Sequence, residues 1–339
     1  MNELLLITSA DQLQPFVGLH GLPAIDPLSF SSLKPDAYLV LIQKQEQLSA
    51  RCALWWTNTP HYGCHQVGLI GQYQVQDAAS ADLLLQQSCQ ELTAMGCTMA
   101  IAPMDGNTWR SYRLISDRGT APPFFLEPNH PDDYLDSFLT AGFVPLATYS
   151  SALNADLTQR APRLDRVERR LSDSGISIRS LNLDNFESEL QQVYQLASLS
   201  FQNNFLYTPI SQGEFITQYR QIQPWVKSEL VLLAEQNQKL VGFLFAVPDV
   251  LQQKYSQIDT VIIKTVAVLP GRTYAGLGNV LVARVQAIAA QLGYTRAIHA
   301  LMHDHNNSRN LSDRYATTMR RYTLFSKQLK RFLNPKIPA

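Results

Sequence analysis

Residues 265–286, TVAVLPGRTYAGLGNVLVARVQ, combine the residue types of an anion-binding site. The β-branched and apolar start predicts a buried strand, the centre with Pro and Gly predicts a turn, and the apolar periodicity after Gly276 predicts a helix. N–H groups in the first turn of a helix lack intrahelical partners, and the helix dipole favours negative charge there. Glycine lets a ligand approach the backbone closely. The stretch therefore predicts a cradle for a phosphate group.

Spacing separates three phosphate-binding motifs. A P-loop needs Lys and then Ser or Thr after its last glycine, but Asn279 and Val280 follow here. A dinucleotide fingerprint needs a third small residue three positions after the second glycine, where this chain has Leu281. A third pattern, V-x-P, then Arg or Gln, then G-x-G, fits in every interval. Its positions are Val268-Leu269-Pro270, Thr273 and Gly276-Leu277-Gly278. An ordinary strand, turn and helix without a ligand is the alternative.

This third pattern resembles the acyl-CoA loop of the GNAT acyltransferase superfamily. The one departure is Thr273, which stands where the family has Arg or Gln, with Arg272 beside it. In that family the amides of the loop hold the pyrophosphate of CoA. The resemblance implies that acetyl-CoA, or another acyl-CoA, is the cosubstrate. It assigns cofactor binding to Val266, Val268, Thr273, Tyr274, Ala275, Gly276, Leu277, Gly278 and Asn279.

The resemblance also implies N-acetyltransferase chemistry. Such an enzyme places the thioester beside an amine, deprotonates the amine, stabilises the oxyanion and protonates the leaving thiolate. In the family the strand before the loop supplies the oxyanion amide, and a Tyr seven residues after an Asn supplies the acid. Here Asn306 and Asn307 precede Tyr315 by nine and eight residues. Tyr315 is therefore the first candidate acid, Tyr322 the second, and Asn307 joins the cofactor residues. A Tyr that only packs against the sheet edge fits equally well.

Histidines gather near the end of the next predicted strand, at 295–302. They are His299, His303 and His305, with Asp304 among them. A His near its ordinary pKa suits proton abstraction, so His299 and His303 are candidate bases. Solvated polar residues are the alternative. A metal site is not expected, because GNAT transfer needs no metal.

Composition limits the class of protein. The 339 residues and the apolar fraction of 45% predict two packed domains. Equal numbers of acids and bases, 28 each, argue against a nucleic-acid or anionic-membrane binder. The start, MNELLLITSADQL, lacks the basic region of a signal peptide, so a cytoplasmic location is expected. The cysteines match no zinc motif and should stay reduced; they are Cys52, Cys64, Cys89 and Cys97.

Hydrophobic periodicity predicts two similar α/β halves. In the first half we expect strands at 36–43, 47–56, 65–76, 98–103 and 144–151, and helices at 81–94 and 134–141. In the second half we expect strands at 177–181, 229–235, 240–247, 260–268 and 295–302, and helices at 186–201, 214–221, 278–292 and 308–318. The charged stretch 155–174 predicts a linker helix.

The chain thus resembles a tandem GNAT protein, with two GNAT-like α/β domains that each hold a mixed twisted sheet flanked by helices. We expect a degenerate domain at 1–154, the linker at 155–174 and the domain with the acyl-CoA loop at 175–339. One continuous sheet through both halves would contradict two separate sheets. The first half keeps FLTAGF at 138–143, which resembles the family's Y-x-x-x-G-F element. Its counterpart of the loop, DAASAD at 77–82, has no glycine and two carboxylates, so no CoA should bind there.

Two functions remain open. One is an acyltransferase that moves an acetyl group from acetyl-CoA to an amine of an unidentified small molecule or peptide. The other is a non-catalytic acyl-CoA-binding or interaction protein that retains the fold. A homodimer is possible, and no nucleic-acid or membrane partner is expected. Polar and aromatic residues of the first half could line the acceptor pocket or pack a domain interface; they are Asn107, Trp109, Tyr112 and Arg113.

Overall fold

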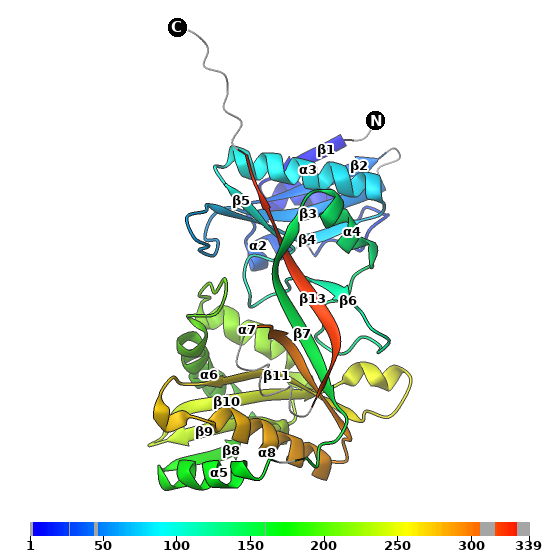
Figure 1. Cartoon of the computed structure of the whole chain (residues 1–339). Coiled ribbons are helices and arrows are strands. Elements are labelled where there is room, and N and C mark those ends of the chain that lie inside the picture. Colours follow the sequence, from blue (N-terminus) through cyan, green and yellow to red (C-terminus); the bar gives the residue numbers. More distant parts are fainter. Residues whose placement is uncertain (1–2, 27, 44–46, 160, 306–315, 331–339) are drawn as a thin grey trace.

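The computed structural model describes residues 3–26, 28–43, 47–159, 161–305 and 316–330. The first half lies above the second in Figure 1, and two long strands run between them. The elements of the first half are β1 Glu3–Ile7, α1 Ala10–Leu13, α2 Ser29–Leu33, β2 Ala37–Gln43, β3 Gln47–Trp55, β4 Val67–Val75, α3 Ala78–Ala94, β5 Met99–Ala102, β6 Leu114–Asp117, α4 Asp133–Thr140 and β7 Val144–Asn154. Helix α5, Arg163–Asp173, follows inside the stretch expected to be a linker helix.

The second half repeats the plan. Its elements are β8 Ile176–Ser180, α6 Phe186–Phe201, α7 Gln212–Ile222, β9 Val231–Gln236, β10 Lys239–Pro248, β11 Thr260–Val268, α8 Leu277–Gln291, β12 Arg296–His303 and β13 Thr317–Gln328. The hairpin between β9 and β10 turns on Asn237 and Gln238, which both have positive φ, as a tight turn between twisted strands requires.

The expected elements are confirmed except at a few places. Strands β1, β6 and β13 and helices α1 and α2 were not expected; all of them except β13 have only four or five residues, too few to show a clear period. Most of the helix expected at 308–318 lies outside the described residues. Its last two residues, Thr317 and Thr318, belong to β13 instead, so that end of the expected helix is wrong.

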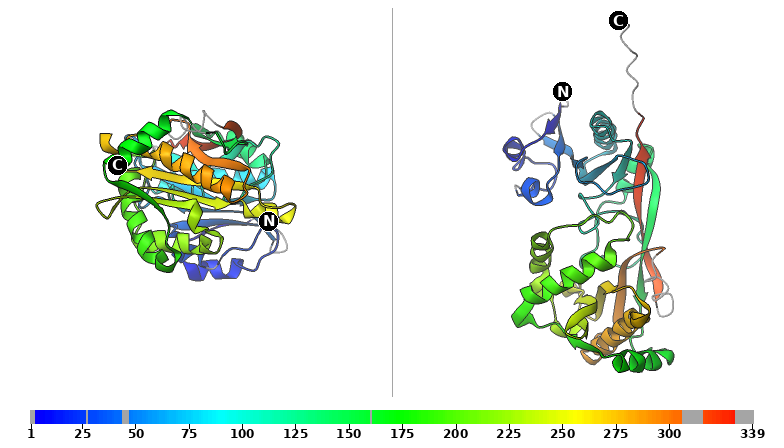
Figure 2. Two further views of the ribbon diagram at one scale, coloured as in Figure 1. Left: turned by 90° about the horizontal axis from the view of Figure 1, so that it is seen from below. Right: turned by 90° about the vertical axis from the view of Figure 1, so that its left-hand side faces the viewer.

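The strands form one continuous sheet of mixed direction. Its order is β1-β2-β3-β4-β5-β13-β7-β12-β11-β10-β9-β8, with β6 paired to β13. The expectation of two separate sheets is therefore wrong. In each half an antiparallel run ends in a parallel pair, β4 with β5 and β11 with β12. The layering expected of each half, helices packed on a mixed sheet, is confirmed (Figure 2).

The halves exchange their last strands. Strand β13 follows the second half in sequence but pairs with β5 of the first, whereas β7 of the first half pairs with β12 of the second. The two long strands also pair with each other from Thr317 to Ser326 (Figure 1). We keep 1–154, 155–174 and 175–339 as the proposed division, with the amendment that β13 completes the sheet beside β5.

Buried side chains of both halves mix near this exchange. One core contains Leu206 from the second half beside Trp55 and Leu69 from the first. Another contains Phe124 of the first half beside Phe215 and Phe243 of the second. Burial of apolar surface at about 25 cal/mol per Å² therefore couples the halves as well as stabilising each. Among the described residues, no helix is long and apolar enough to cross a membrane.

Candidate functional site

The parallel strands β11 and β12 part in the middle and leave an open edge. They pair from Thr260 to Ile263, and β11 then continues beside β10 only. The N–H of Leu269, just after β11, donates to the carbonyl of Val241 in the neighbouring strand β10. The N–H and C=O groups of successive residues in a strand point to opposite sides. Those of Val268 and Val266 therefore face the edge of β11 that lies away from β10. Within the described residues, the Ser200 hydroxyl bonded to the Val268 carbonyl at 3.4 Å is the one partner found there.

Helix α8 begins beside this edge with a glycine. Gly276 has φ of 83°, a left-handed value that glycine adopts without strain. The first helical bond runs from the Val280 N–H to the Gly276 carbonyl, at 3.1 Å. The N–H groups of Leu277, Gly278 and Asn279 are thus left without helical partners. The space at Gly278 faces β11, since an added Cβ would lie 3.6 Å from Val266 Cγ1. Gly278 of the predicted loop therefore lies against Val266 and Val268 of the predicted strand.

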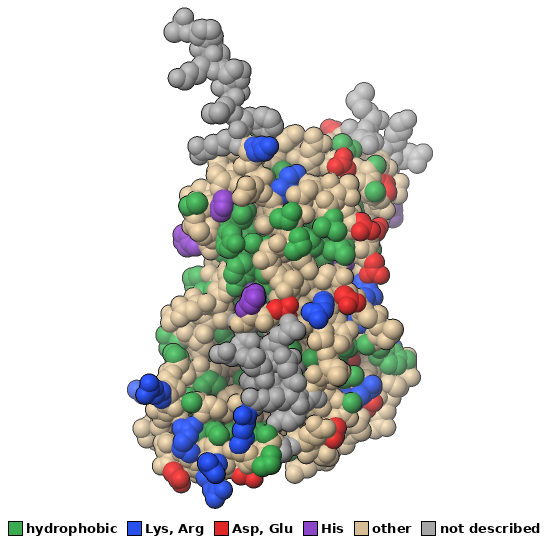
Figure 3. Space-filling model, in the orientation of Figure 1, with side chains coloured by type: hydrophobic (Ala, Val, Ile, Leu, Met, Phe, Trp, Pro, Cys, Tyr) green, Lys and Arg blue, Asp and Glu red, His purple; other side chains and the backbone are tan. Residues whose placement is uncertain are grey.

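Helix α5 braces the loop. The Arg170 guanidinium donates to the Thr273 carbonyl at 3.1 Å and also to the Ala275 carbonyl. A Cβ at Gly276 would come within 2.9 Å of Val167 Cγ1, so α5 packs directly against the loop. Figure 3 shows Lys and Arg side chains gathered at this lower end of the molecule, over α5 and α8. The sequence predicted a linker here but gave no sign of this bracing.

Two residues of the predicted loop precede the helix and differ in their surroundings. The Thr273 side chain is exposed, and its carbonyl is held by Arg170. The Tyr274 hydroxyl donates to Gln236 Oε1 at 3.1 Å, which anchors the turn to the β9–β10 hairpin. The Tyr274 side chain is thus held by the protein, whereas the Thr273 side chain is open to solvent. Asn307 lies outside the described residues.

The histidines expected to cluster fall into two environments. His299 is buried under α8, where the Gln286 side-chain amide lies 2.8 Å from His299 Nε2, and burial lowers the pKa of this imidazole to about 4. A register shift in β12 after His299 places His303 elsewhere. The His303 ring packs on Tyr149, with ring centroids 4.9 Å apart. His303 Nδ1 accepts the N–H of His305, which leaves the proton of the neutral ring on Nε2.

Neither environment suits a general base. His299 is enclosed and paired with Gln286, and the open nitrogen of His303 carries a proton. Asp304 accepts hydrogen bonds from Thr148 and Ser150. No group of three possible metal ligands occurs among the described residues.

Tyr322, the second candidate acid, lies in a buried polar network. Its hydroxyl donates to Glu127 and lies 3.0 Å from the Ser151 hydroxyl. The other carboxylate oxygen of Glu127 binds Arg320, and neither side chain of that ion pair is exposed. Burial, followed by the neighbouring Glu127, raises the pKa of Tyr322 well above its ordinary value. Tyr322 therefore lies where β13 pairs with β7, opposite Tyr149, in the region where the two halves exchange strands. Tyr315 lies outside the described residues.

Lys264 is a functional candidate that the sequence analysis missed. It occupies a bulge in β11, because Ile263 and Thr265 oppose consecutive residues of β10. Its ammonium donates to the Leu126 carbonyl of the first half at 3.1 Å. Burial, and then Arg113, lower the pKa of Lys264 to about 7, with Glu127 opposing them. One signal was available, since Lys264 is the single charge within the apolar strand TVIIKTVAV.

The first half carries a closed counterpart of this site. Strand β4 also bulges near Gln72, but the Gln72 N–H donates to Asp105 at 2.7 Å. The Val75 N–H donates to the Tyr134 hydroxyl at 3.2 Å. A Cβ at Gly71 would meet the Met104 carbonyl at 2.4 Å, so the chain lies directly on the strand edge. Asp105 and Tyr134 therefore bind the free edge of β4, whereas the corresponding edge of β11 in the second half is open.

The helix N-terminus of the first half is closed as well. Asp77 lies between β4 and α3, as expected, and its carboxylate accepts the Ser80 N–H at 2.7 Å. This cap satisfies one of the free amides that a phosphate would need. Asp82 adds a second carboxylate within the first two turns of α3.

The polar and aromatic residues after β5 reach into the second half. Trp109 Nε1 donates to the Thr208 carbonyl at 3.0 Å, and its ring packs against Phe201 and Phe215. Arg113 lies over the rings of Tyr112 and Tyr149 and donates to the Leu301 carbonyl at 3.3 Å. These contacts form an interface between the halves beside the open end of β12.

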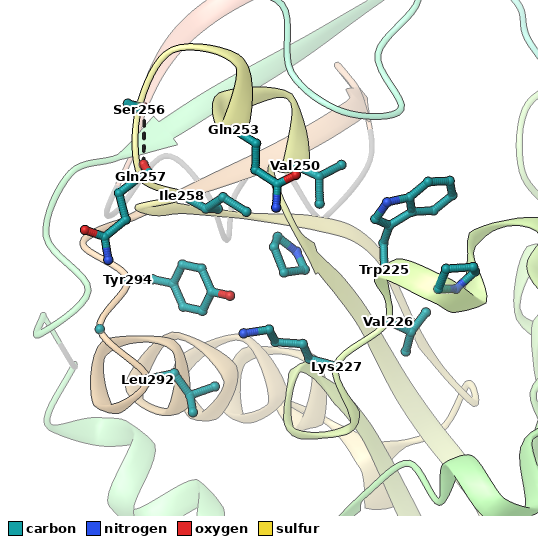
Figure 4. A pocket seen from close by; sticks show the side chains of 13 residues that line it. Trp225, Val226, Lys227, Val250, Gln253, Ser256, Gln257, Ile258, Leu292 and Tyr294 are labelled. Carbon is teal, nitrogen blue, oxygen red and sulfur yellow. Dashed lines mark hydrogen bonds between the residues drawn. The ribbon is translucent and has the colours of Figure 1, made fainter.

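A hollow of about 630 Å³ lies at the other ends of β11 and α8. Figure 4 shows the Lys227 ammonium directed toward the Tyr294 ring, with Trp225 on the opposite side. Ile258 precedes β11 and Leu292 follows α8, so the hollow is separated from the loop by the length of both elements. It is not part of the candidate site.

Comparison with known proteins gives a family for part of the chain and a fold for nearly all of it. Residues 190–314 match the model described as the Acetyltransferase (GNAT) family, so this part of the chain is a GNAT domain. No curated protein matches the sequence.

Solved structures extend the likeness over nearly the whole chain. One is the glucosamine N-acetyltransferase region of a fungal multi-domain β-N-acetylglucosaminidase, with TM-score 0.54 and 13% identity over 96% of this chain and 38% of that one. A GCN5-related N-acetyltransferase from Anabaena variabilis gives TM-score 0.53 and 10% identity, over 97% and 73%. Eis1 from Mycobacterium abscessus gives 0.52 and 11%, over 97% and 74%. At these identities the likeness shows a GNAT fold.

Proposed function

We propose that this protein transfers an acyl group from acetyl-CoA, or another acyl-CoA, to an amine of a small molecule or peptide. The observation that carries the proposal is the open edge of β11 at Val266 and Val268 beside the glycine-bearing N-terminus of α8. The helix N-terminus suits the pyrophosphate. The strand edge suits the amide-containing arm that ends in the thioester, because it can hydrogen-bond like an added strand. The proposed location is the cytoplasm, where the four free cysteines would stay reduced.

The reaction needs no covalent enzyme intermediate. The amine nitrogen attacks the thioester carbonyl, so that a C–N bond forms and the carbonyl oxygen becomes an oxyanion. The C–S bond then breaks, and the thiolate takes a proton to leave as CoA. The Val266 N–H stands at the open edge and is the proposed oxyanion donor, a kind of interaction worth about 2.7–4 kcal/mol. Tyr315 stays the proposed acid for the thiolate.

We assign proton abstraction from the amine to Lys264. A base with a pKa near the working pH is half in its neutral form and still accepts a proton readily. Lys264, with a pKa of about 7, meets this condition two residues from Val266. His303 is assigned to the lining of the acceptor side, where its ring lies beside Tyr149 and Phe205.

Lys264→Met should lower kcat/KM by about 100-fold or more near neutral pH, the usual weight of general base catalysis. Because the pKa of Lys264 is lowered to about 7, the neutral amine builds up as pH rises through that value. The wild-type kcat/KM should therefore rise between about pH 6 and pH 8, and this rise should be missing in the variant. Lys227→Met removes an exposed lysine in the distant hollow and should leave the profile unchanged. An unaltered profile in Lys264→Met would move the role to another group.

One acetyl-CoA should bind per chain. The second half offers an open strand edge, whereas Asp105 and Tyr134 occupy that edge in the first half and Asp77 caps its helix. Isothermal titration calorimetry measures the number of sites. A second site, weakened by changes at Ala79 or Ser80, would show that the first half also binds CoA.

Release of CoA thiol tests the transfer itself. With acetyl-CoA and a panel of primary amines and short peptides, we expect thiol release that depends on the amine. The alternative is a non-catalytic acyl-CoA-binding protein, which the exposed Thr273 in place of the family's Arg or Gln favours. Acetyl-CoA binding without amine-dependent thiol release across the panel would support that alternative.

A further inference from the structure

Arg51 is a buried cation in the first half, away from the proposed acyl-CoA site. It lies in the middle of β3 and is 7% exposed. Strand pairing sets Arg51 opposite Val40 of β2 and Gln74 of β4, so these side chains share one face of the sheet. The N-terminal segment covers this face with Leu13 and other apolar residues, and Figure 2 (right) shows that segment, in blue, as a layer of its own.

The Arg51 guanidinium has no protein partner within the described residues. Its Nε is fully enclosed and forms no hydrogen bond, whereas its two terminal nitrogens, which also bind no described protein group, are not fully enclosed. Burial lowers the pKa of Arg51, and the groups that oppose this effect are the phenols of Tyr38 and Tyr134 rather than a carboxylate. Buried charges in proteins are ordinarily paired, because an isolated one is expensive to remove from water.

The other buried arginines follow that rule. Arg320 binds Glu127 and three backbone carbonyls. Arg113 donates to the carbonyls of Tyr112 and Leu301 and lies over two aromatic rings. Arg51 differs from both of these arginines, because no described protein group binds its guanidinium.

We propose that Arg51 binds a small monocarboxylate in the first half. A guanidinium presents parallel N–H donors that match the two oxygens of a carboxylate. A single cation among apolar residues neutralises one negative charge, which favours a monocarboxylate over a phosphate. Gln74, directly opposite on β4, has a side-chain amide that can donate to the same ligand. The site at Arg51 would therefore accept a small anion. The closed strand edge and the capped helix of the same half would still exclude CoA.

Acetate is the probe, with chloride at equal ionic strength and inorganic phosphate as comparison anions. We expect acetate to raise the unfolding temperature of the whole chain saturably, because a ligand of the folded state stabilises it. The Nε–H signal of Arg51 in nitrogen-15 NMR spectra should shift over the same concentrations. Chloride and phosphate should produce neither change.

Arg51→Met should bind acetate roughly 10- to 100-fold more weakly, the loss expected for hydrogen bonds to a charged group. Arg321→Met is the matched control, since Arg321 is an exposed arginine on strand β13, and it should keep wild-type acetate binding. Acetyl-CoA affinity should be unchanged in both variants. If Arg51→Met does not fold, Arg51→Lys keeps the charge, loses the fork and should still weaken acetate binding. Equal acetate binding in an Arg51 variant, or no saturable response in the wild type, would overturn the proposal.

Discussion

Gly276→Asp should weaken acetyl-CoA binding by at least about 100-fold. The change places a carboxylate at the helix N-terminus, where the pyrophosphate would lie, and adds a Cβ within 2.9 Å of Val167 Cγ1. It also forces a left-handed φ of 83° on a residue that is not glycine. Each charge-assisted bond lost is worth about 1.5–3 kcal/mol, so loss of two bonds accounts for the expected effect. Isothermal titration calorimetry with acetyl-CoA measures it.

Gly293→Asp is the matched control for this variant. Gly293 follows the same helix at its other end, has a φ of 91° and has no atom within 4 Å of its would-be Cβ. The backbone strain is similar, but the new carboxylate lies far from the loop. Acetyl-CoA affinity should stay near the wild-type value. Equal losses in the two variants would mean that strain in α8, rather than a pyrophosphate site, explains the result.

The acyl-CoA loop could be predicted from sequence because its signals are local. The strand from Thr260, the turn and the helix after Gly276 each have a pattern within a few residues. Open backbone groups at Val266 then follow from the place of β11 in the fold. The contrast with the first half was also visible, since 77–82 contains no glycine.

What the sequence did not predict depends on contacts between distant residues. The exchange of β7 and β13 pairs Phe325 with Ala102, more than two hundred positions away. Arg170 reaches the loop from a helix about one hundred residues earlier. The pKa of Lys264 is lowered by burial against Leu126 and by Arg113 of the first half. None of these contacts leaves a periodicity in the sequence.

Arg320→Met should lower the free energy of unfolding by about 3–5 kcal/mol, because it leaves the Glu127 carboxylate buried without its cation. Both side chains of the pair are 0% exposed and lie where β13 crosses the first half. Chemical denaturation followed by circular dichroism measures the loss. Since the two halves share this strand, the transition should shift as a whole.

Two further variants make the test specific. Arg220→Met breaks the ion pair between Arg220 and Glu187, whose side chains are 56% and 58% exposed. It should lower the free energy of unfolding by only about 0–1 kcal/mol. Adding Glu127→Met to Arg320→Met should restore part of the stability, because no unpaired charge stays buried. A loss in Arg320→Met no larger than that in Arg220→Met would show that the buried pair does not stabilise the exchange.

The crystal structure of the chain with acetyl-CoA tests the central claim most directly. We expect one acetyl-CoA, with its pyrophosphate within hydrogen-bond distance of the N–H groups of Leu277, Gly278 and Asn279. The thioester carbonyl should face the Val266 N–H at the open edge of β11. Acetyl-CoA bound at the β4 edge of the first half, or in the hollow beside Lys227 and Tyr294, with the α8 cradle unoccupied, would contradict the proposed site.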